Sequence, residues 1–506
     1  MHQEGKLVII RVPNRIAFPK WVIILLVAAL PACQVSPSGT SLTAASQPPT
    51  ITLPPTATSL PQTLTSRPTS TPRPTAPPTS VRATYPPTAD PEVSNWLRIH
   101  AWPLDKIEPI DEDDFSDLTP LKDFIGKARI VALGEGTHGT HEFFTMKHRL
   151  VRFLVQEMGF NTFAIEASWP VAIRVNDYVL RGEGDPATAL AGIYFPWNTQ
   201  EVLDMIEWMR RHNQDPGGSP VVSFHGFDAQ VPTVAVSNVV DYFQRVDLNY
   251  AAEARDKYDC LLGDIAQYTG LPKVKRDACR ADLQSVMDRL KTNRQRYMDS
   301  SSPETYTLAE QNARIVLQVE DVLTDPRRSV RDRYLAENVR WLLDQAGPDA
   351  KIILWAHNAH VADAAQGSHA SMGRHLRDMY AQDMIIFGFS FNDGQINAYG
   401  YPLERQTANG SLGAYPVPPA LPKITFEWYA HSAGLPAFIL NLRDLRIDQS
   451  TTWWLTQPLL LRSIGATYDQ TLSPGFYLYE YNLPEAFDAI IYIDRSTPTQ
   501  LLPLEY

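Results

Sequence analysis

Seven short apolar runs recur between residues 129 and 493, and long amphipathic stretches separate them. Each run is continuously apolar, which is typical of strands that helices cover on both faces, whereas a half-buried strand alternates apolar and polar residues. The pattern predicts an α/β fold with a mostly parallel central sheet flanked by helices. The predicted strands are residues 129–133, 162–165, 221–224, 351–355, 385–389, 438–442 and 489–493.

Helical spacing and helix-start residues appear between these runs. Pro170 could occupy the first turn of one helix, and Asn198 or Thr199 could cap another. From about residue 236 to 345 no strand pattern appears, so we expect a large helical insertion that forms a cap or subdomain. The clearest helical spacing joins Phe143, Lys147, Leu150, Leu154 and Met158.

The first 33 residues have the pattern of a secretory signal. A basic leader precedes the apolar run 21–30, which is short for a bilayer span. The sequence Leu-Pro-Ala-Cys at residues 30–33 resembles a bacterial lipobox, so Cys33 is the expected lipidation site. The alternative is an uncleaved N-terminal anchor. Under either interpretation, the protein is extracytoplasmic and attached to the bacterial cell membrane, as a lipoprotein under the first.

A tract rich in Pro, Thr and Ser covers residues 34–90 and lacks the apolar clusters that a core needs. We expect it to be a disordered linker, extended enough to act as a spacer. The folded domain is then residues 91–506. Its two cysteines, Cys260 and Cys279, flank a helix-breaking Gly-Leu-Pro stretch at residues 270–272. We predict a disulfide, although two buried free thiols fit the sequence equally well.

The charge balance excludes one class of partner. The chain has 45 Lys and Arg residues against 56 Asp and Glu residues, for a net charge of -11. A protein that binds nucleic acid through phosphates needs clustered basic residues, so we expect no nucleic-acid partner.

Four predicted strands are followed by histidines, acidic residues or both. In open α/β sheets, ligands bind beyond the carboxyl ends of the strands. Each polar residue alone could be a helix cap or a satisfied buried group, but four such strand ends together favour a site. The residues in question are Glu135 and His138, Glu166, His225 and Asp228, and His357 and His360.

This set of residue types suits hydrolysis by an activated water. Ester hydrolysis needs a base near neutral pKa, a group that orients it, and a stabiliser for the oxyanion. His138 is the candidate base, and Glu135 or Glu166 could orient its ring. A covalent mechanism is less favoured because no Gly-x-Ser-x-Gly motif is present. A metal site is the main alternative, since His138 with His141 and His357 with His360 form His-x-x-His pairs.

Seven sequence segments resemble the erythromycin esterase family, over residues 118 to 495. The segments are ALGEGTHGTHEFF, GFNTFAIE, FHGFDAQ, RDRYLAENVRWLL, ILWAHNAHV, SMGRHL and FDAIIYIDR. The resemblance implies hydrolysis of a macrolactone or related small-molecule ester without a metal or other cofactor. It implies that His138 is the general base, that Glu135 and Glu166 are essential carboxylates, and that His357 is a second essential histidine.

The resemblance also bears on substrate contacts. Where some family members have an arginine nine residues after the base, this chain has Lys147, which lacks the planar fork of a guanidinium. Arg331 could supply a guanidinium instead. The expected substrate-binding residues are Lys147, His360, Arg331, His225, Asp228 and Arg374. Two other functions stay open, namely a metal-dependent hydrolase or metal-binding protein of the same fold, and a non-catalytic ligand-binding surface lipoprotein.

Overall fold

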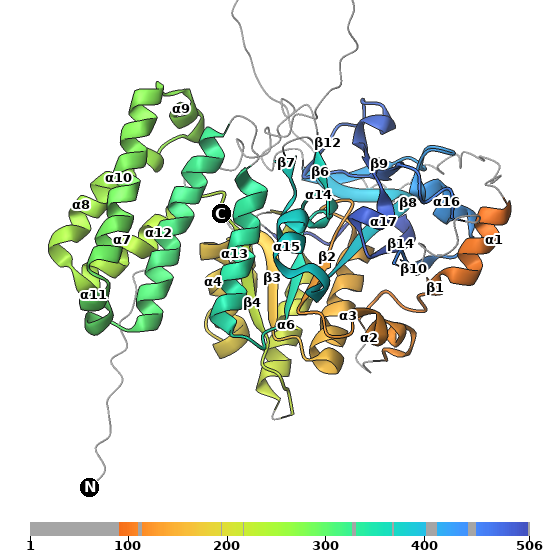
Figure 1. Ribbon diagram of the computed structural model, residues 1–506, viewed down its shortest axis with the longest axis horizontal. Helices are drawn as coiled ribbons and strands as arrows, with labels where there is room; N and C mark the ends of the chain where they lie inside the picture. The colour runs from red at the N-terminus through yellow and green to blue at the C-terminus, as the bar shows by residue number, and fades with distance from the viewer. Residues whose placement is uncertain are drawn as a thin grey trace, which may run out of the picture. The chain divides into compact units, whose positions relative to one another are not determined.

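All seven predicted strands form, and they belong to one sheet (Figure 1). The computed structural model describes residues 91–109, 114–193, 195–215, 217–325, 330–366, 369–400, 412–443 and 452–503. The predicted signal, the lipidation site Cys33 and the linker at 34–90 lie outside these residues. The seven strands are β2 (Ile130–Leu133), β3 (Thr162–Ser168), β4 (Ser223–Asp228), β5 (Ile352–Trp355), β8 (Met384–Gly400), β10 (Ala437–Asn441) and β14 (Ala489–Ser496).

The sheet is mostly parallel, as predicted. Its strand order is β1-β10-β14-β8-β2-β5-β3-β4, and every neighbouring pair from β14 to β4 is parallel. The antiparallel pairs lie at the β1 end and along the distal half of β8. Shorter strands are β1 (Trp102–Pro103), β9 (Leu412–Val417) and β12 (Thr467–Tyr468) in this sheet, and the separate pairs β6 (Ala365–Gln366) with β7 (His369–Ala370) and β11 (Leu459–Arg462) with β13 (Leu478–Tyr481).

Four strands, β3, β4, β8 and β14, extend further toward their carboxyl ends than the apolar pattern predicts. β3 includes Glu166, and β4 includes His225 and Asp228, all of which we expected after the strands. β4 also begins later than predicted, at Ser223; Val221 lies outside the ladder and is 56% exposed. Backbone hydrogen bonds continue the pairing of β3 with β4 after the apolar residues end. Polar residues at the site edge are therefore held on strands.

The central strands are buried on both faces, which explains their continuous apolar runs. In β2, Ile130 and Ala132 belong to one hydrophobic cluster, whereas Val131 and Leu133 belong to the other. Helices α3 (His141–Met158) and α6 (Gln200–Gln214) contribute to the second cluster, and helices α13 (Val330–Ala346) and α15 (Met372–Tyr380) to the first. The sheet is therefore the middle layer between two helical layers.

Local sequence explains where several helices begin and end. The side chain of Thr199 caps α6 by accepting from the Val202 N–H at 3.4 Å. Pro170 lies in the first turn of α4 (Trp169–Arg181), where a missing N–H costs nothing. Gly159 ends α3 with φ at 71°, a conformation that favours glycine. Other helices outside the insertion are α1 (Pro91–His100), α2 (Pro120–Ile125), α5 (Pro186–Ala191), α14 (Asn358–Val361), α16 (Phe426–Ser432) and α17 (Leu483–Ala486).

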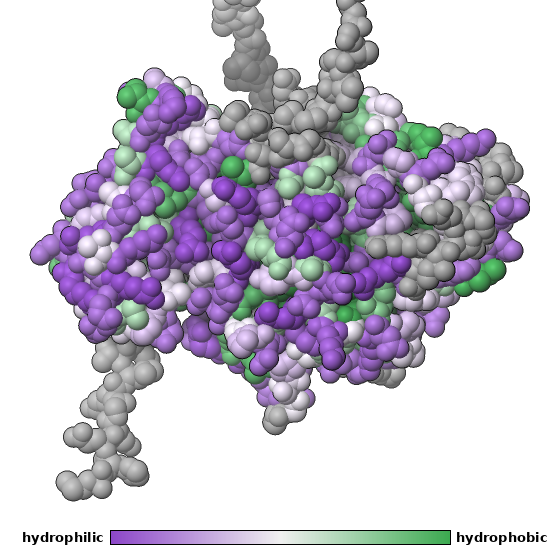
Figure 2. Space-filling model, viewed as in Figure 1, coloured by the Kyte–Doolittle hydropathy of each residue, from purple (hydrophilic) through white to green (hydrophobic). Residues whose placement is uncertain are grey.

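The described residues between β4 and β5 form helices joined by short loops, and none of them forms a strand. Figure 1 shows most of these helices, in green, grouped at one side of the sheet, and we call α7 to α12 the helical arm. Figure 2 shows mainly hydrophilic side chains over the arm in this view, whereas aromatic rings fill its interior. The arm comprises α7 (Thr233–Val246), α8 (Leu248–Tyr258), α9 (Ile265–Gly270), α10 (Lys273–Thr292), α11 (Arg294–Ser300) and α12 (Pro303–Thr324).

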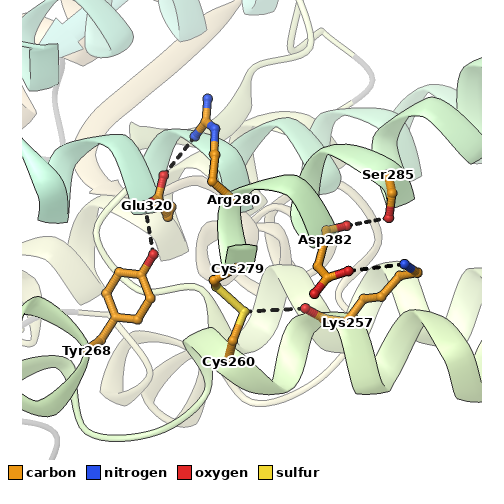
Figure 3. The surroundings of a disulfide bond; sticks show 8 residues. All are labelled: Lys257, Cys260, Tyr268, Cys279, Arg280, Asp282, Ser285 and Glu320. Carbon is orange, nitrogen blue, oxygen red and sulfur yellow. Dashed lines mark hydrogen bonds and ion pairs between the residues drawn. A yellow bond between two sulfur atoms is a disulfide. The ribbon is translucent and has the colours of Figure 1, made fainter. Parts of the chain in front are cut away.

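A disulfide joins Cys260 and Cys279 inside the arm (Figure 3). Their Cα atoms are 5.9 Å apart, and 19 positions separate them in the sequence. Beside the bond, Tyr268 donates to Glu320 at 2.7 Å, and Arg280 pairs with the same carboxylate at 3.1 Å (Figure 3). These contacts tie α9 and α10 to α12. Within the described ranges, no helix has both the length and the apolar character needed to cross a membrane.

Candidate active site

The carboxyl ends of three adjacent strands carry the predicted catalytic residues. Glu135 and His138 follow β2, Glu166 lies near the end of β3, and His357 comes two residues after β5. Because β2, β5, β3 and β4 are parallel neighbours, these side chains meet at one edge of the sheet. The rings of His138 and His357 have centroids 5.1 Å apart.

The loop from β2 to α3 is fixed by its neighbours. The Asn358 N–H donates to the Glu135 carbonyl at 2.8 Å, and the Ile464 N–H donates to the Gly136 carbonyl at 2.7 Å. A Cβ at Gly139 would lie 2.0 Å from the Asn397 carbonyl oxygen, so a side chain cannot fit there without a backbone shift. The loop therefore presents His138 in a defined position.

The tautomer of His138 follows from its partner. Nδ1 lies 2.6 Å from Glu135 Oε1. An ionised carboxylate only accepts hydrogen bonds, so Nδ1 must donate. The neutral ring then carries a lone pair on Nε2, and its side chain is 12% exposed. His138 is thus arranged as a histidine base oriented by a buried carboxylate.

Glu135 is buried completely and uses both carboxylate oxygens. Its Oε2 atom accepts from Lys147 Nζ at 2.6 Å and from Trp355 Nε1 at 2.7 Å. Lys147 has no exposed surface, and its Nζ lies 4.3 Å from the centroid of the Trp355 ring. We expected Lys147 to contact substrate. In this structure its ammonium group is buried and donates to Glu135.

Burial and pairing act in opposite directions on this ion pair. Burial raises the pKa of Glu135, but Lys147 and His138 outweigh burial and hold that pKa below its usual value. Burial lowers the pKa of Lys147 to about 8, against the attraction of Glu135. Both groups are therefore charged at neutral pH, and each depends on the other.

His357 is held as a neutral donor. Its Nδ1 atom accepts from the Ala359 N–H at 3.2 Å, which places the proton of the neutral ring on Nε2. Burial lowers the pKa of His357 to about 3, and a proton on the neighbouring His138 would act in the same direction. Nε2 is buried and has no hydrogen-bond partner. An unpaired buried donor beside the candidate base is a feature that needs a functional explanation.

Glu166 links several parts of the site. Its Oε2 atom accepts from the His357 N–H at 2.9 Å, and its Oε1 atom pairs with Arg331 at 2.8 Å and with His360 at 3.3 Å. Burial raises the pKa of Glu166, but His360 and Arg331 hold it well below its usual value. Glu166 thus joins β3 to the segment after β5 and to α13.

Arg331 connects Glu166 with the neighbouring strand. Its Nη2 atom also donates to Asp228 Oδ2 at 2.6 Å, so one guanidinium pairs with carboxylates from β3 and β4. Asp228 additionally accepts from the Ala229 N–H at 2.7 Å. The expected guanidinium is therefore present at the site, with 19% of its side chain exposed.

His360 contacts both acids and a guanidinium. Burial lowers its pKa, but Asp332 and Glu166 raise it to about 10. Arg331 Nη1 lies 2.9 Å from His360 Nε2, a contact that as a hydrogen bond would need a neutral ring. We assign the charged ring, because two carboxylates next to the imidazole outweigh one guanidinium. Arg331 and His360 are then two cations that share the carboxylate of Glu166.

Two predicted substrate-binding residues lie outside this network. His225 Nε2 lies 3.1 Å from Ser223 Oγ, two positions back on the same strand, and burial lowers the His225 pKa to about 4. Arg374, which lies on α15, pairs with Asp363 at 2.8 Å. Neither hydrogen-bonds to Glu135, His138, Glu166 or His357 within the described residues.

The His-x-x-His pairs do not converge as ligand sets. His141 begins α3 and pairs with Glu201 at 2.6 Å and Glu108 at 3.2 Å, whereas His138 pairs with Glu135. The hydrogen bonds with Glu108 and Glu201 raise the pKa of His141 to about 10. Among the residues that the structure describes, no group of three or more His, Cys, Asp or Glu side chains could hold a metal ion.

Three contributing residues were not predicted from the sequence. Trp355 donates to Glu135, Trp197 packs edge-on against His138 with centroids 5.5 Å apart, and Asp332 accepts from His360 Nδ1 at 2.7 Å. Asp332 had a signal, since it directly follows Arg331 in a matched segment. Trp197 had none, because its partner is 59 positions away in the sequence.

Comparison with known proteins identifies relatives over most of the chain. The family model described as Erythromycin esterase matches residues 155–496. This range includes Glu166, Arg331, His357 and His360, and it begins after Glu135 and His138.

Individual relatives cover similar ranges. The Bacillus subtilis (strain 168) protein named "Putative hydrolase YbfO" is 22% identical over 440 residues, which are 81% of this chain and 92% of that protein. Erythromycin esterase type II of Escherichia coli is 26% identical over 343 residues, which are 60% and 80% of the two chains. A crystal structure of a Bacillus cereus protein has a TM-score of 0.71 and 27% identity, covering 81% of this chain and 99% of that one.

Replacement of Lys147 tests the buried ion pair. Lys147→Met leaves Glu135 buried without its cation, and we expect a loss of about 3–5 kcal/mol in the free energy of unfolding. The wild-type pKa of Glu135 is lowered, so its contribution is present above the unfolded pKa and is lost as pH falls through the folded pKa. The deficit of the variant should thus be larger at pH 7 than near pH 4 in denaturant unfolding.

The matched control is Lys122→Met. Lys122 pairs with Glu157 at 2.6 Å, but both side chains are more than a third exposed, so we expect a change below about 1 kcal/mol. Equal deficits for the two variants at pH 7 would contradict the central place of the Lys147 pair.

Proposed function

This chain belongs to the erythromycin esterase family of hydrolases, and we propose that it cleaves a carboxylic ester with a water molecule activated by His138. One observation carries the proposal. His138 is paired with the buried Glu135 at 2.6 Å, and its ring lies next to that of His357, which carries an unpartnered donor. A base, its orienting carboxylate and an oxyanion donor are the groups that ester hydrolysis requires.

The reaction begins with proton transfer from water to His138 Nε2. The water oxygen bonds to the acyl carbon, and the carbonyl oxygen becomes the oxyanion of a tetrahedral intermediate. Glu135 stabilises the imidazolium that forms, as a carboxylate does when it orients a catalytic histidine. The bond from the acyl carbon to the alcohol oxygen then breaks, and His138 returns its proton to that oxygen. The products are an acid and an alcohol, and no covalent intermediate forms.

His357 is the proposed donor to the oxyanion. Its Nε2–H has no partner in the protein, so a substrate oxygen could take that hydrogen bond without displacing another. A neutral donor in a buried site costs little reorganisation when charge develops on the substrate. The backbone contact of His357 with Glu166 fixes where this ring lies.

The proposed substrate is a macrolactone or a related ester. The family name and the Escherichia coli relative named erythromycin esterase support this choice. The metal-dependent hydrolase and the non-catalytic binding protein remain alternatives, and both become outcomes of the assay below.

Removal of the base provides the main test. We expect His138→Ala to lower kcat by roughly a hundredfold or more while the thermal unfolding midpoint changes little, because a general base typically contributes that much. The assay measures hydrolysis of erythromycin and of simple aryl esters, with and without chelator.

His431→Gln is the matched control, because His431 also pairs with an acid, Asp494, at 2.6 Å but is 44% exposed. Near-normal turnover of His138→Ala would contradict the mechanism. Activity that chelator removes and added metal restores would favour the metal-dependent alternative, and binding without hydrolysis would favour the binding protein.

A second prediction concerns His357. We expect His357→Phe, which keeps an aromatic ring but removes Nε2–H, to lower kcat by roughly a hundredfold to a thousandfold with a much smaller change in KM. Loss of one oxyanion donor has that effect. Steady-state kinetics measure the two constants separately. A rise in KM with kcat unchanged would contradict the oxyanion role and indicate substrate binding instead.

We also propose that the enzyme is a lipoprotein on the outer side of the cell membrane. The lipobox-like sequence ending at Cys33 supports this location. In a bacterial host, Cys33→Ser should abolish incorporation of a labelled fatty acid, whereas a double Cys260→Ser and Cys279→Ser control should still be labelled. Labelling that persists in Cys33→Ser would contradict lipidation at this position.

A further inference from the structure

The first turn of α13 contacts β3, β4 and the segment that follows β5. Two consecutive residues make these contacts in different directions. Arg331 reaches Glu166 on β3 and Asp228 on β4, whereas Asp332 reaches the residues that follow β5. Because α13 closes the helical insertion, this turn is where the insertion meets the catalytic edge of the sheet.

The carboxylate of Asp332 contacts three donors, which come from three different elements. Its Oδ1 atom accepts from His360 Nδ1 at 2.7 Å and from the Met372 N–H at 3.0 Å, and its Oδ2 atom lies 3.2 Å from His369 Nε2. These donors belong to α14, α15 and β7. The Asp332 residue is 4% exposed, so water cannot replace the lost contacts easily if the carboxylate is removed.

The contact with Asp332 determines which edge of His360 faces the site. With Nδ1 directed at Asp332, Nε2 faces Glu166 at 3.3 Å. Glu166 in turn accepts from the His357 backbone at 2.9 Å. A continuous chain of contacts thus runs from Asp332 through His360 and Glu166 to the residue that we assign as oxyanion donor.

We propose that Asp332 is a positioning residue for ester hydrolysis, which holds His360 against Glu166 and through Glu166 fixes His357. This inference rests on the function proposed above. Asp332 itself touches no reacting atom in that mechanism, and its effect passes through His360. The helical insertion thereby contributes this buried carboxylate to the reaction, beside the guanidinium of Arg331.

The charge state of His360 gives a readout that a merely structural role would not move. Burial lowers the pKa of His360, and Asp332 is the largest of the influences that raise it. Without the carboxylate, His360 should be charged only at lower pH. The charged and titratable groups that face His360 are Asp332 and Arg331 on α13, Glu166 on β3, His357 before α14 and His369 on β7.

The test compares Asp332→Asn in the full chain with a control carboxylate. Asp247→Asn is matched, because Asp247 is also largely buried and takes several donors, Arg289 and Arg296 among them, but within the helical arm. We expect Asp332→Asn to lower kcat at pH 7 roughly tenfold to a hundredfold, the effect of losing an outer group that orients a catalytic ligand. KM should change less. In a plot of kcat against pH, the alkaline limb should move to lower pH, because His360 loses its proton at lower pH without the carboxylate.

A second measurement does not depend on activity. Nitrogen NMR of histidine-labelled protein, with the His360 signals assigned from His360→Gln, should report a doubly protonated ring at pH 7 in wild type and a neutral ring in Asp332→Asn. The Asp247→Asn control should resemble wild type in both measurements, whatever stability it loses.

The outcomes separate the two proposals. An unchanged kcat profile in Asp332→Asn would overturn the positioning role, whether or not the His360 signals shift. An unchanged His360 charge state would overturn it as well. If wild type hydrolyses no ester, the proposed function fails, and a loss of His360 protonation in Asp332→Asn would still support the claim that Asp332 holds this ring.

Discussion

A carboxylate with no exposed surface, that of Glu135, is the constraint on which the rest of the site depends. An unpaired charge in a protein interior costs several kcal/mol, so Glu135 can stay ionised only if its oxygens are fully satisfied. Lys147 from α3 and Trp355 from β5 satisfy one oxygen, and His138 from the intervening loop takes the other. Three elements must therefore be in place before the carboxylate is stable, and the position that satisfies them is also the position that orients His138.

The carboxylate of Glu166, on the other side of His357, needs partners for the same reason. Glu166 is buried as well, and its partners come from the segment after β5 and from α13. The two carboxylates thus tie β2, β3 and β5 together and join the insertion to the sheet. The contacts that orient the site residues are therefore the same contacts that join these elements of the fold. Precise catalytic geometry needs this kind of surrounding support.

How much of the fold and of the site the sequence predicts depends on the physical property that each sequence pattern reflects. Continuous apolar runs record burial on both faces, so they located all seven main strands and hence the edge where Glu135 and His357 meet. They did not record where hydrogen bonding ends, so Glu166 and Asp228 were placed after strands that in fact contain them. Lys147 falls at helical spacing with apolar neighbours, which could have indicated burial. Its partner Glu135 lies 12 positions away across a loop, and no periodicity connects the two.

Spacing also failed to describe the histidine pairs, for a related reason. His138 lies in a loop and His141 begins a helix, so the interval of three residues does not place them on one surface. Their ring partners, Glu135 and Glu201, lie in different parts of the chain. Sequence spacing predicts proximity only inside a regular element, and the contacts that decide each ring's role here come from outside one.

His357 and His360 show most clearly how partners decide the role of a histidine. They are the same residue type three positions apart, and their partners differ. Burial lowers the pKa of both rings. Nδ1 of His357 accepts from a backbone N–H, and the ring is neutral with its pKa lowered to about 3. His360 lies next to two carboxylates, and they raise its pKa to about 10. One short segment thus supplies a neutral donor and a cation to the same site. Environments that push similar groups apart in this way are how enzymes assign distinct acid and base roles at one pH.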